Sequence, residues 1–155
     1  MKPSRARKDW EEGVLAADIG YHIAQAEVTT NRLYAKHIGE PLLLRPVEYS
    51  LLMLLLANGE LSPKQLAQAL SLAAPTLTML VDRLFERGLI ERVRSETDRR
   101  SQRVLLTAPG HALAERAAAS SPAVNTAFDQ LLTAGEQMIL TELLKKIAAH
   151  QRQLD

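Results

Sequence analysis

Cysteine is absent from the 155 residues of this chain. Disulfide bonds, metal sites built on thiolates and redox sensing by a thiol are therefore excluded. Aromatic residues are scarce, at 4% of the chain, whereas alanine and leucine are abundant. This composition favours a largely helical protein, and the length suits one domain with its own core.

Long hydrophobic runs and a strong net charge are also missing. The longest apolar run covers residues 51–57 and is far too short to span a membrane. The N-terminal sequence MKPSR leads into further charged residues rather than into the apolar core of a signal peptide. We therefore expect a soluble, cytoplasmic protein with no membrane partner. The net charge of +1 does not by itself indicate a nucleic-acid-binding protein.

Residues typical of a catalytic or metal site form no recognisable pattern. We find no Ser-His-Asp arrangement, no glycine-rich phosphate loop and no pair of catalytic carboxylates. The four histidines lack a metal-ligand spacing such as i, i+4, and we expect structural or surface roles for them. They are His22, His37, His111 and His150. We therefore expect no enzyme, no metal and no cofactor, and a small enzyme stays open only as an alternative.

Residues 62–103 are predicted to form a short helix, a turn, a second helix and a β-hairpin. Ser62 and Gln65 have the spacing of a capping box at the start of the first helix. Pro75 begins the second helix, and Gly88 ends it. Two helices that cross steeply can gather their leucines into one small core, as in a helix-turn-helix that offers its second helix to the DNA major groove. An ordinary corner between two helices is the alternative.

Two segments after the second helix have the character of strands. They are residues 89–94 (LIERVR) and 102–107 (QRVLLT), joined by a polar turn at 95–100. A basic hairpin directly after the second helix is typical of the wing of a winged helix. Residues 60–61 are expected to add a short third strand.

Four short sequences in this region match a known pattern. They are LVDRL at 80–84, RGLIER at 87–92, DRRS at 98–101, and LT at 106–107 followed by Gly110. They resemble the MarR family of bacterial transcription regulators. The resemblance covers about residues 40–150 and is strongest over residues 62–110.

The resemblance implies a mainly helical α+β fold in a single domain of residues 1–155. A winged helix-turn-helix lobe with a small antiparallel β-wing would occupy residues 46–107. Helices at 10–38 and 108–153 would form a dimer interface. The residues agree, because these terminal helices carry more apolar surface than one winged lobe can cover. A monomer that folds them back on itself is the alternative.

The helix boundaries follow from proline, glycine and capping residues. The first helix is predicted over residues 10–37, and Gly39 and Pro41 are expected to end it. The last two helices are predicted over about residues 108–132 and 136–151. Thr133 and Glu136 have the spacing of a capping box at the start of the last one.

The candidate DNA-binding residues lie on the first helix of the motif, on the outward side and N-terminal tip of the second helix, and on the wing. Threonine and small apolar groups can contact thymine methyls, and a helix N-terminus can bind phosphate. The first two turns of the second helix contain no Asn, Gln or Lys, so we expect limited direct base readout and a larger part for DNA shape. The set comprises Lys64, Ala74, Pro75, Thr76, Thr78, Met79, Arg83, Arg94 and Arg99.

The resemblance implies two further roles. Arg100 would form a structural ion pair with Asp82 that ties the wing to the second helix. A small-molecule effector, which the family implies to be an anionic aromatic compound, would bind between the first helix, the next helix and the winged lobe. The candidate lining residues are Tyr21, His22, Gln25, Arg45 and Tyr49. A regulator without an effector and with a filled core is the alternative.

Together these features predict a sequence-specific, effector-responsive transcriptional repressor. Its partners would be double-stranded DNA, a second copy of itself and the effector. A dimer would place two recognition helices about 34–36 Å apart on a pseudo-palindromic operator. The alternative is a winged-helix interaction module that docks to a protein without binding DNA.

Overall fold

The computed structural model describes residues 10–94 and 102–150. The chain divides into two compact units, Met1–Arg32 and Leu33–Asp155. Within the described residues, no helix is both long enough and apolar enough to cross a membrane.

The first unit is built from two helical segments. A turn of 3₁₀ helix, η1, covers Gly13–Ala17 and is followed by helix α1, Ile19–Tyr34, which continues into the second unit. The α-helix therefore begins later than residue 10, where the sequence predicted it. Asp18 accepts a hydrogen bond from the backbone N–H of Tyr21 at 2.8 Å and so caps the helix. No residue of η1 or α1 is buried, and Leu15, Ile19 and Ile23 are 39–70% exposed.

The prediction that Gly39 and Pro41 end the first helix is wrong. The chain continues as a wider π-helical turn, η2 (Ala35–Gly39), and a short helix, α2 (Glu40–Leu42). The proline lies in the first turn of α2, where its missing N–H costs least. The helical path ends only at Leu43, whose φ of 52° is left-handed.

Tyr34 explains why a glycine is needed in that turn. A Cβ at Gly39 would lie 3.0 Å from the Tyr34 ring and 3.2 Å from the Leu44 carbonyl oxygen. The Tyr34 hydroxyl donates a hydrogen bond to the same Leu44 oxygen at 3.0 Å. Burial raises the pKa of Tyr34 to about 12, with further contributions from Glu48 and Tyr49. The phenol therefore stays protonated and remains a donor at neutral pH.

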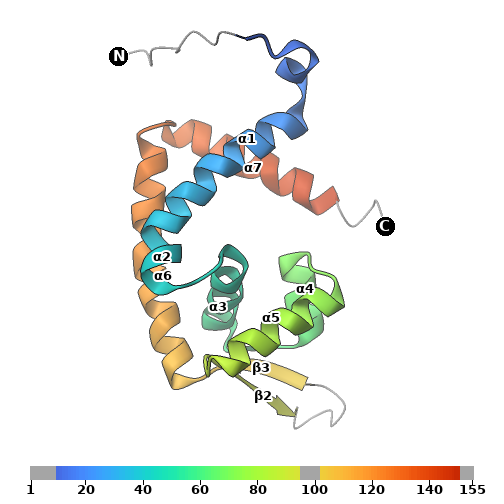
Figure 1. Ribbon diagram of the computed structural model, residues 1–155, viewed down its shortest axis with the longest axis vertical. Coiled ribbons are helices and arrows are strands. Elements are labelled where there is room, and N and C mark those ends of the chain that lie inside the picture. Colours follow the sequence, from blue (N-terminus) through green and yellow to red (C-terminus); the bar gives the residue numbers. More distant parts are fainter. Residues whose placement is uncertain (1–9, 95–101, 151–155) are drawn as a thin grey trace. The chain divides into compact units, whose positions relative to one another are not determined.

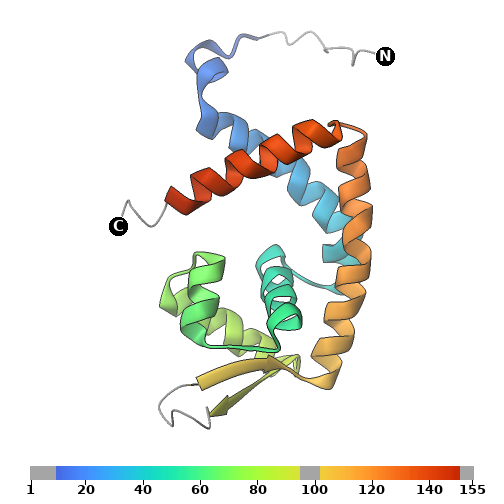
Figure 2. The ribbon, with the colours of Figure 1, turned by 180° about the vertical axis from the view of Figure 1, so that it is seen from behind.

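Helix α3 (Pro46–Asn58) forms the centre of the second unit. Its side chains Leu51, Leu52 and Leu55 are at most 1% exposed. The helix contacts α6, α4 and the strands β1 and β3, so it connects the parts of this unit (Figures 1 and 2). This burial agrees with the apolar character of nearly all its side chains.

The helix-turn-helix consists of α4 (Pro63–Leu70) and α5 (Ala74–Glu86). The capping box at the start of α4 is confirmed, because the Ser62 N–H donates to Gln65 Oε1 at 2.9 Å and the Gln65 N–H donates to Ser62 Oγ at 3.2 Å. Gly88, with a φ of 68°, follows the end of α5 as predicted.

The wing is part of a three-stranded antiparallel sheet in the order β1-β3-β2. Its strands are β1 (Glu60–Leu61), β2 (Ile90–Arg94) and β3 (Gln102–Leu106). The expected third strand is confirmed, since β1 pairs with β3 through Glu60 opposite Leu105. The predicted turn at 95–100 lies outside the described residues.

The last two helices are α6 (Ala108–Asp129) and α7 (Ala134–His150). Thr107 caps α6 by accepting a hydrogen bond from the Gly110 N–H at 3.1 Å. Only glycine fits at position 110, because a Cβ there would lie 1.8 Å from the Leu89 carbonyl oxygen. This close approach holds the start of α6 against the beginning of the wing.

Helix α7 begins with the predicted capping box. The Thr133 N–H donates to Glu136 Oε2 at 2.8 Å, and the Glu136 N–H donates to Thr133 Oγ1 at 3.3 Å. Hydrogen bonds from the Thr133 backbone and hydroxyl hold the pKa of the Glu136 carboxyl below its usual value. No residue of α7 is buried. Its large apolar side chains are all exposed: Met138, Ile139, Leu140, Leu143, Leu144 and Ile147.

Candidate nucleic-acid interface

The first two turns of α5 present one exposed face. The buried side of the helix carries Leu77, Leu80, Val81 and Leu84. The predicted outward residues Ala74, Pro75, Thr76, Thr78 and Met79 are all exposed, and Met79 is 73% exposed. Lys64 is exposed in the first turn of α4. The structure therefore brings these six predicted residues to the surface of the helix-turn-helix.

Arg83 makes a contact that the sequence did not predict. Its Nε lies 3.7 Å from Oε1 of Glu48, whose side chain is 3% exposed, while the Arg83 side chain is 46% exposed. Part of this guanidinium is therefore used within the fold, and its role in DNA binding stays a prediction.

Glu48 is bound from three sides. Its Oε2 accepts hydrogen bonds from the Arg45 N–H at 2.8 Å and from Arg87 Nη1 at 3.3 Å. Arg87 Nη2 also donates to the Leu43 carbonyl oxygen at 3.1 Å. Arg87 thus reaches across the fold to Glu48, a contact that the sequence did not predict. A signal was present, because Glu48 is the only charged residue of α3.

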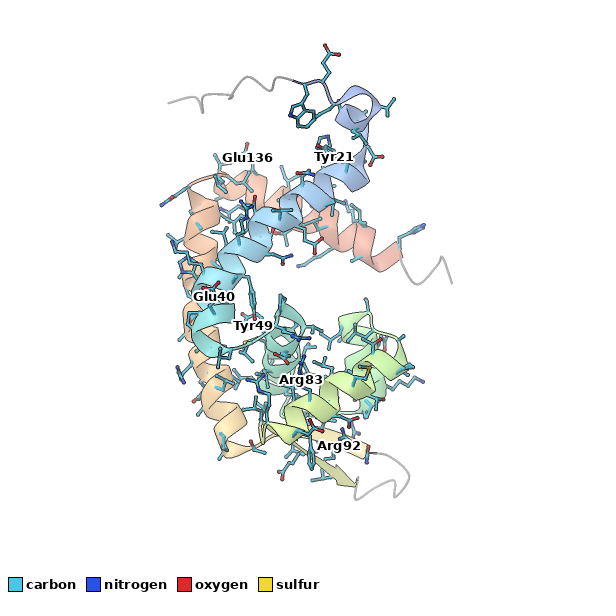
Figure 3. All side chains as sticks on the ribbon, viewed as in Figure 1. Tyr21, Glu40, Tyr49, Arg83, Arg92 and Glu136 are labelled. Carbon is cyan, nitrogen blue, oxygen red and sulfur yellow. The ribbon has the colours of Figure 1, made fainter. Side chains whose placement is uncertain are left out.

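Arg92 ties the wing to α5. Figure 3 shows Arg92 beside α5. Its Nη2 donates to Oδ1 of Asp82, and its guanidinium carbon lies 5.4 Å from the centroid of the Phe85 ring. Arg92 is opposite Val104 in the sheet and shares its face, which is the face toward the core. Arg100, the partner implied for Asp82 by the resemblance, lies outside the described residues, so that pair stays a prediction.

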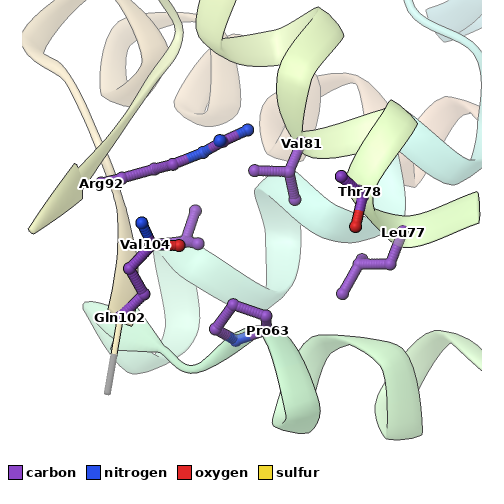
Figure 4. A pocket seen from close by; sticks show the side chains of 7 residues that line it. All are labelled: Pro63, Leu77, Thr78, Val81, Arg92, Gln102 and Val104. Atoms are coloured by element: carbon purple, nitrogen blue, oxygen red, sulfur yellow. The ribbon is translucent and has the colours of Figure 1, made fainter. Parts of the chain in front are cut away.

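A shallow pocket lies between the start of α4, helix α5 and the two wing strands (Figure 4). Arg92 reaches across it from β2. Its Nε is buried and has no hydrogen-bond partner among the described residues. The lining residues are Pro63, Leu77, Thr78, Val81, Arg92, Gln102 and Val104.

The wing arginines divide into two groups. Arg103 Nη1 donates to Gln65 Oε1 at 3.1 Å, and its Nε lies 3.8 Å from Glu60 Oε1, so Arg103 holds β3 to α4 and β1. The side chain of Arg94 and the whole of Arg99 lie outside the described residues. Their contact with DNA stays a prediction.

The effector candidates are distributed over both units. In the first unit, Tyr21 is half-buried, Gln25 is exposed, and His22 Nε2 lies 3.0 Å from the Ala16 carbonyl oxygen. In the second unit, Arg45 is exposed and the Tyr49 ring contacts Tyr34 edge-to-face, at 5.7 Å between centroids. No described residues form a group of three or more His, Cys, Asp and Glu side chains able to hold a metal ion.

Residues 44–102 match the model of the MarR family. The multiple antibiotic resistance protein MarR of Salmonella typhimurium is 32% identical over 108 residues, which cover 69% of this chain and 75% of that protein. A putative transcriptional regulatory protein for the hcr operon of Thauera aromatica is 29% identical over 135 residues, or 87% of this chain and 81% of that protein.

Solved structures with the same fold include complexes with DNA and with a small molecule. The transcriptional repressor CouR bound to a 23-mer DNA duplex superposes with a TM-score of 0.82 at 30% identity, over 90% of this chain and 99% of that chain. NadR in complex with 4-hydroxyphenylacetate superposes with a TM-score of 0.71 at 26% identity, over 85% of this chain and 93% of that chain.

The contact between Asp82 and Arg92 predicts coupled stability effects. In a double-mutant cycle on urea unfolding, Asp82→Ala and Arg92→Ala should be non-additive by about 0.5–1 kcal/mol, the range for a half-exposed ion pair. Arg103→Ala is the matched control, because Arg103 contacts Gln65 and Glu60, and it should be additive with Asp82→Ala. Additivity of Asp82→Ala with Arg92→Ala, but coupling with Arg100→Ala, would show that Arg100 is the partner in solution.

Proposed function

This chain belongs to the MarR family of transcription regulators, and on that basis we propose that it represses transcription by binding a pseudo-palindromic operator as a homodimer. A small effector would release it from the DNA. The observation that carries the proposal is the exposed face of α5 beside a wing that Arg92 ties to the same helix. CouR, which has the same fold, is a transcriptional repressor bound to a DNA duplex, and this supports DNA as the partner.

The wing supplies the charge for this interaction. Arg94 and Arg99 are placed by the sequence near the tip of the hairpin, where a wing meets the minor groove. The minor groove distinguishes mainly A·T from G·C, so these arginines would contribute affinity rather than a base code. Arg103 is occupied by Gln65 and Glu60 and is not assigned to DNA.

Replacing Arg94 or Arg99 by Ala should weaken binding to a selected operator and to a scrambled duplex alike. Each lost phosphate contact should also flatten the slope of log affinity against log salt by about one unit. Arg116→Ala, on the exposed surface of α6, removes the same charge outside the proposed interface and should leave both quantities unchanged. Fluorescence anisotropy at several salt concentrations measures them. Unchanged affinity of both wing variants on both duplexes would favour a protein-docking module instead.

Uncovered apolar surface supports the homodimer. The stripe formed by Leu140, Leu143, Leu144 and Ile147 recurs at helical spacing, and these side chains are 43–51% exposed. Helix α1 adds exposed Ile19 (70%) and Val28 (47%). Such an amount of exposed apolar surface on two helices is typical of an interface. A second copy of the same chain is the proposed occupant.

Leu144→Glu should weaken this dimer by about tenfold or more, because a buried leucine contributes about 1.5–3 kcal/mol. Ala149→Glu is the matched control, since it introduces the same charge on the opposite side of α7. Sedimentation equilibrium at micromolar concentration measures the association. A wild-type protein that sediments as a monomer would contradict the proposal. Equal effects of the two variants would show that the stripe is not part of the interface.

Of the predicted effector residues, Arg45 and Tyr49 belong to the second unit, and we propose that they form part of the effector site. Arg45 supplies an exposed cation, and the Tyr49 ring supplies aromatic surface. A carboxylate on an aromatic ring suits both groups, and NadR, of the same fold, is complexed with such a compound.

A panel of aromatic carboxylates that includes 4-hydroxyphenylacetate tests this site. The active compound should raise the melting temperature and release DNA, whereas its uncharged amide should do neither. Arg45→Gln should raise the concentration of the compound needed to release DNA by about tenfold, as expected for loss of a charge-assisted hydrogen bond. Arg116→Gln is the control. No response to any member of the panel would count against an anionic aromatic effector.

A further inference from the structure

The exposed face of α5 offers almost no free hydrogen-bonding group. Ala74, Pro75 and Met79 have no polar atom in their side chains. The Thr78 hydroxyl donates to the Ala74 carbonyl oxygen at 3.0 Å, so its proton is used inside the helix. Only the Thr76 hydroxyl remains on this face without a described partner. A helix with this surface cannot read bases mainly by hydrogen bonds.

Several polar groups of the helix-turn-helix already make contacts within the fold. Asp82 binds Arg92, and Arg83 Nε is directed at the carboxylate of Glu48. In α4, the Gln65 side-chain carbonyl oxygen accepts hydrogen bonds from Ser62 and from Arg103. Base reading through the Asp82 or Gln65 acceptor oxygens would require breaking a contact that holds the wing to the helix-turn-helix.

The side-chain groups that remain on this face are methyl groups and the thioether of Met79. In the major groove, the C5 methyl group of thymine is the apolar group that distinguishes an A·T pair by direct contact. Met79 is 73% exposed and flexible, so it can adapt to such a methyl group, and Thr76 and Thr78 each add a methyl of their own. Apolar side chains at the tip of a DNA-facing helix are complementary to this methyl group, and not to the hydrogen-bonding groups of the base edges.

We propose that α5 reads the thymine methyl groups of its operator, with Met79 and Thr76 as the specificity-determining residues. The proposal rests on the DNA-binding function proposed above and names the chemical group that this function recognises. Thymines should therefore recur at the major-groove positions that face α5. Their methyl groups, rather than their hydrogen-bonding atoms, should account for the preference.

Replacement of thymine by uracil tests the proposal directly, because it removes the methyl group and leaves base pairing intact. The full-length protein is first used to select a preferred duplex from a randomised library. Each thymine of the half-sites is then replaced singly by deoxyuridine, and the affinity is measured. Each methyl that α5 contacts should lower the affinity about fourfold when removed, the factor expected for burial of one methyl-sized group. The same replacement in a scrambled duplex controls for changes of DNA shape.

Protein variants assign the contact to residues. The Met79→Ala variant should bind the thymine duplex more weakly than the unaltered protein does. On the duplex that lacks the contacted methyl group, the two proteins should bind equally well. Thr76→Val keeps the methyl group and should bind as the unaltered protein does, whereas Thr76→Ser keeps only the hydroxyl and should bind more weakly. The opposite order for the two Thr76 variants would mean hydrogen-bond readout and would overturn the assignment of Thr76.

The outcomes separate this inference from the function on which it rests. A preferred duplex whose affinity is unchanged by every uracil replacement would overturn the methyl readout and leave sequence-specific binding intact. A library that yields no preferred duplex would overturn sequence-specific binding, and the inference with it. Loss of affinity at particular thymines, abolished by Met79→Ala, supports both.

Discussion

The buried carboxylate of Glu48 is the constraint on which the position of the recognition helix depends. Taking a carboxylate out of water costs several kcal/mol unless cations and N–H groups surround it. Here the Arg45 N–H, Arg87 and Arg83 share its two oxygens. Arg83 lies in α5, Arg87 directly follows that helix, and Arg45 directly precedes α3, so satisfying the charge brings the two helices together. Removing Arg87 would leave the buried carboxylate with only the Arg45 N–H at 2.8 Å and Arg83 Nε at 3.7 Å.

The same network reaches the chain that connects α2 to α3. Arg87 donates to the Leu43 carbonyl oxygen, and Tyr34 donates to the neighbouring Leu44 oxygen. Both carbonyls lie in a stretch that leaves the helical path at a left-handed residue, Leu43. The connection is thus held by α5 from one side and by Tyr34 from the other. A ligand that contacted Arg45 or Tyr49 would act within one helical turn of Glu48, which is a short physical route to the recognition helix.

Local signals explain which parts of the fold were predictable. Ser62 with Gln65, Thr133 with Glu136, and Gly88 act within a few residues of the backbone, and the structure has each of them as predicted. The end of the first helix was mispredicted because Gly39 serves the packing of Tyr34, and the π-helical turn carries the chain past Pro41. Side-chain partners far apart in sequence, such as Glu48 with Arg87, depend on how helices pack. A single sequence does not contain that information, although a lone charge in an apolar helix indicates that a partner exists.

The candidate interface shows the same division. Exposure of the α5 face follows from helical periodicity and was predicted residue by residue, whereas the engagement of Arg83 and Asp82 depends on tertiary contacts. Those contacts engage Asp82 and part of Arg83 in fixing the helix to the wing and to α3. The first two turns of α5 carry no charged side chain, so electrostatic attraction to DNA would come mainly from Lys64 and from the wing residues Arg94 and Arg99. Affinity and sequence preference would then rest on different residues, and salt should change the first much more than the second.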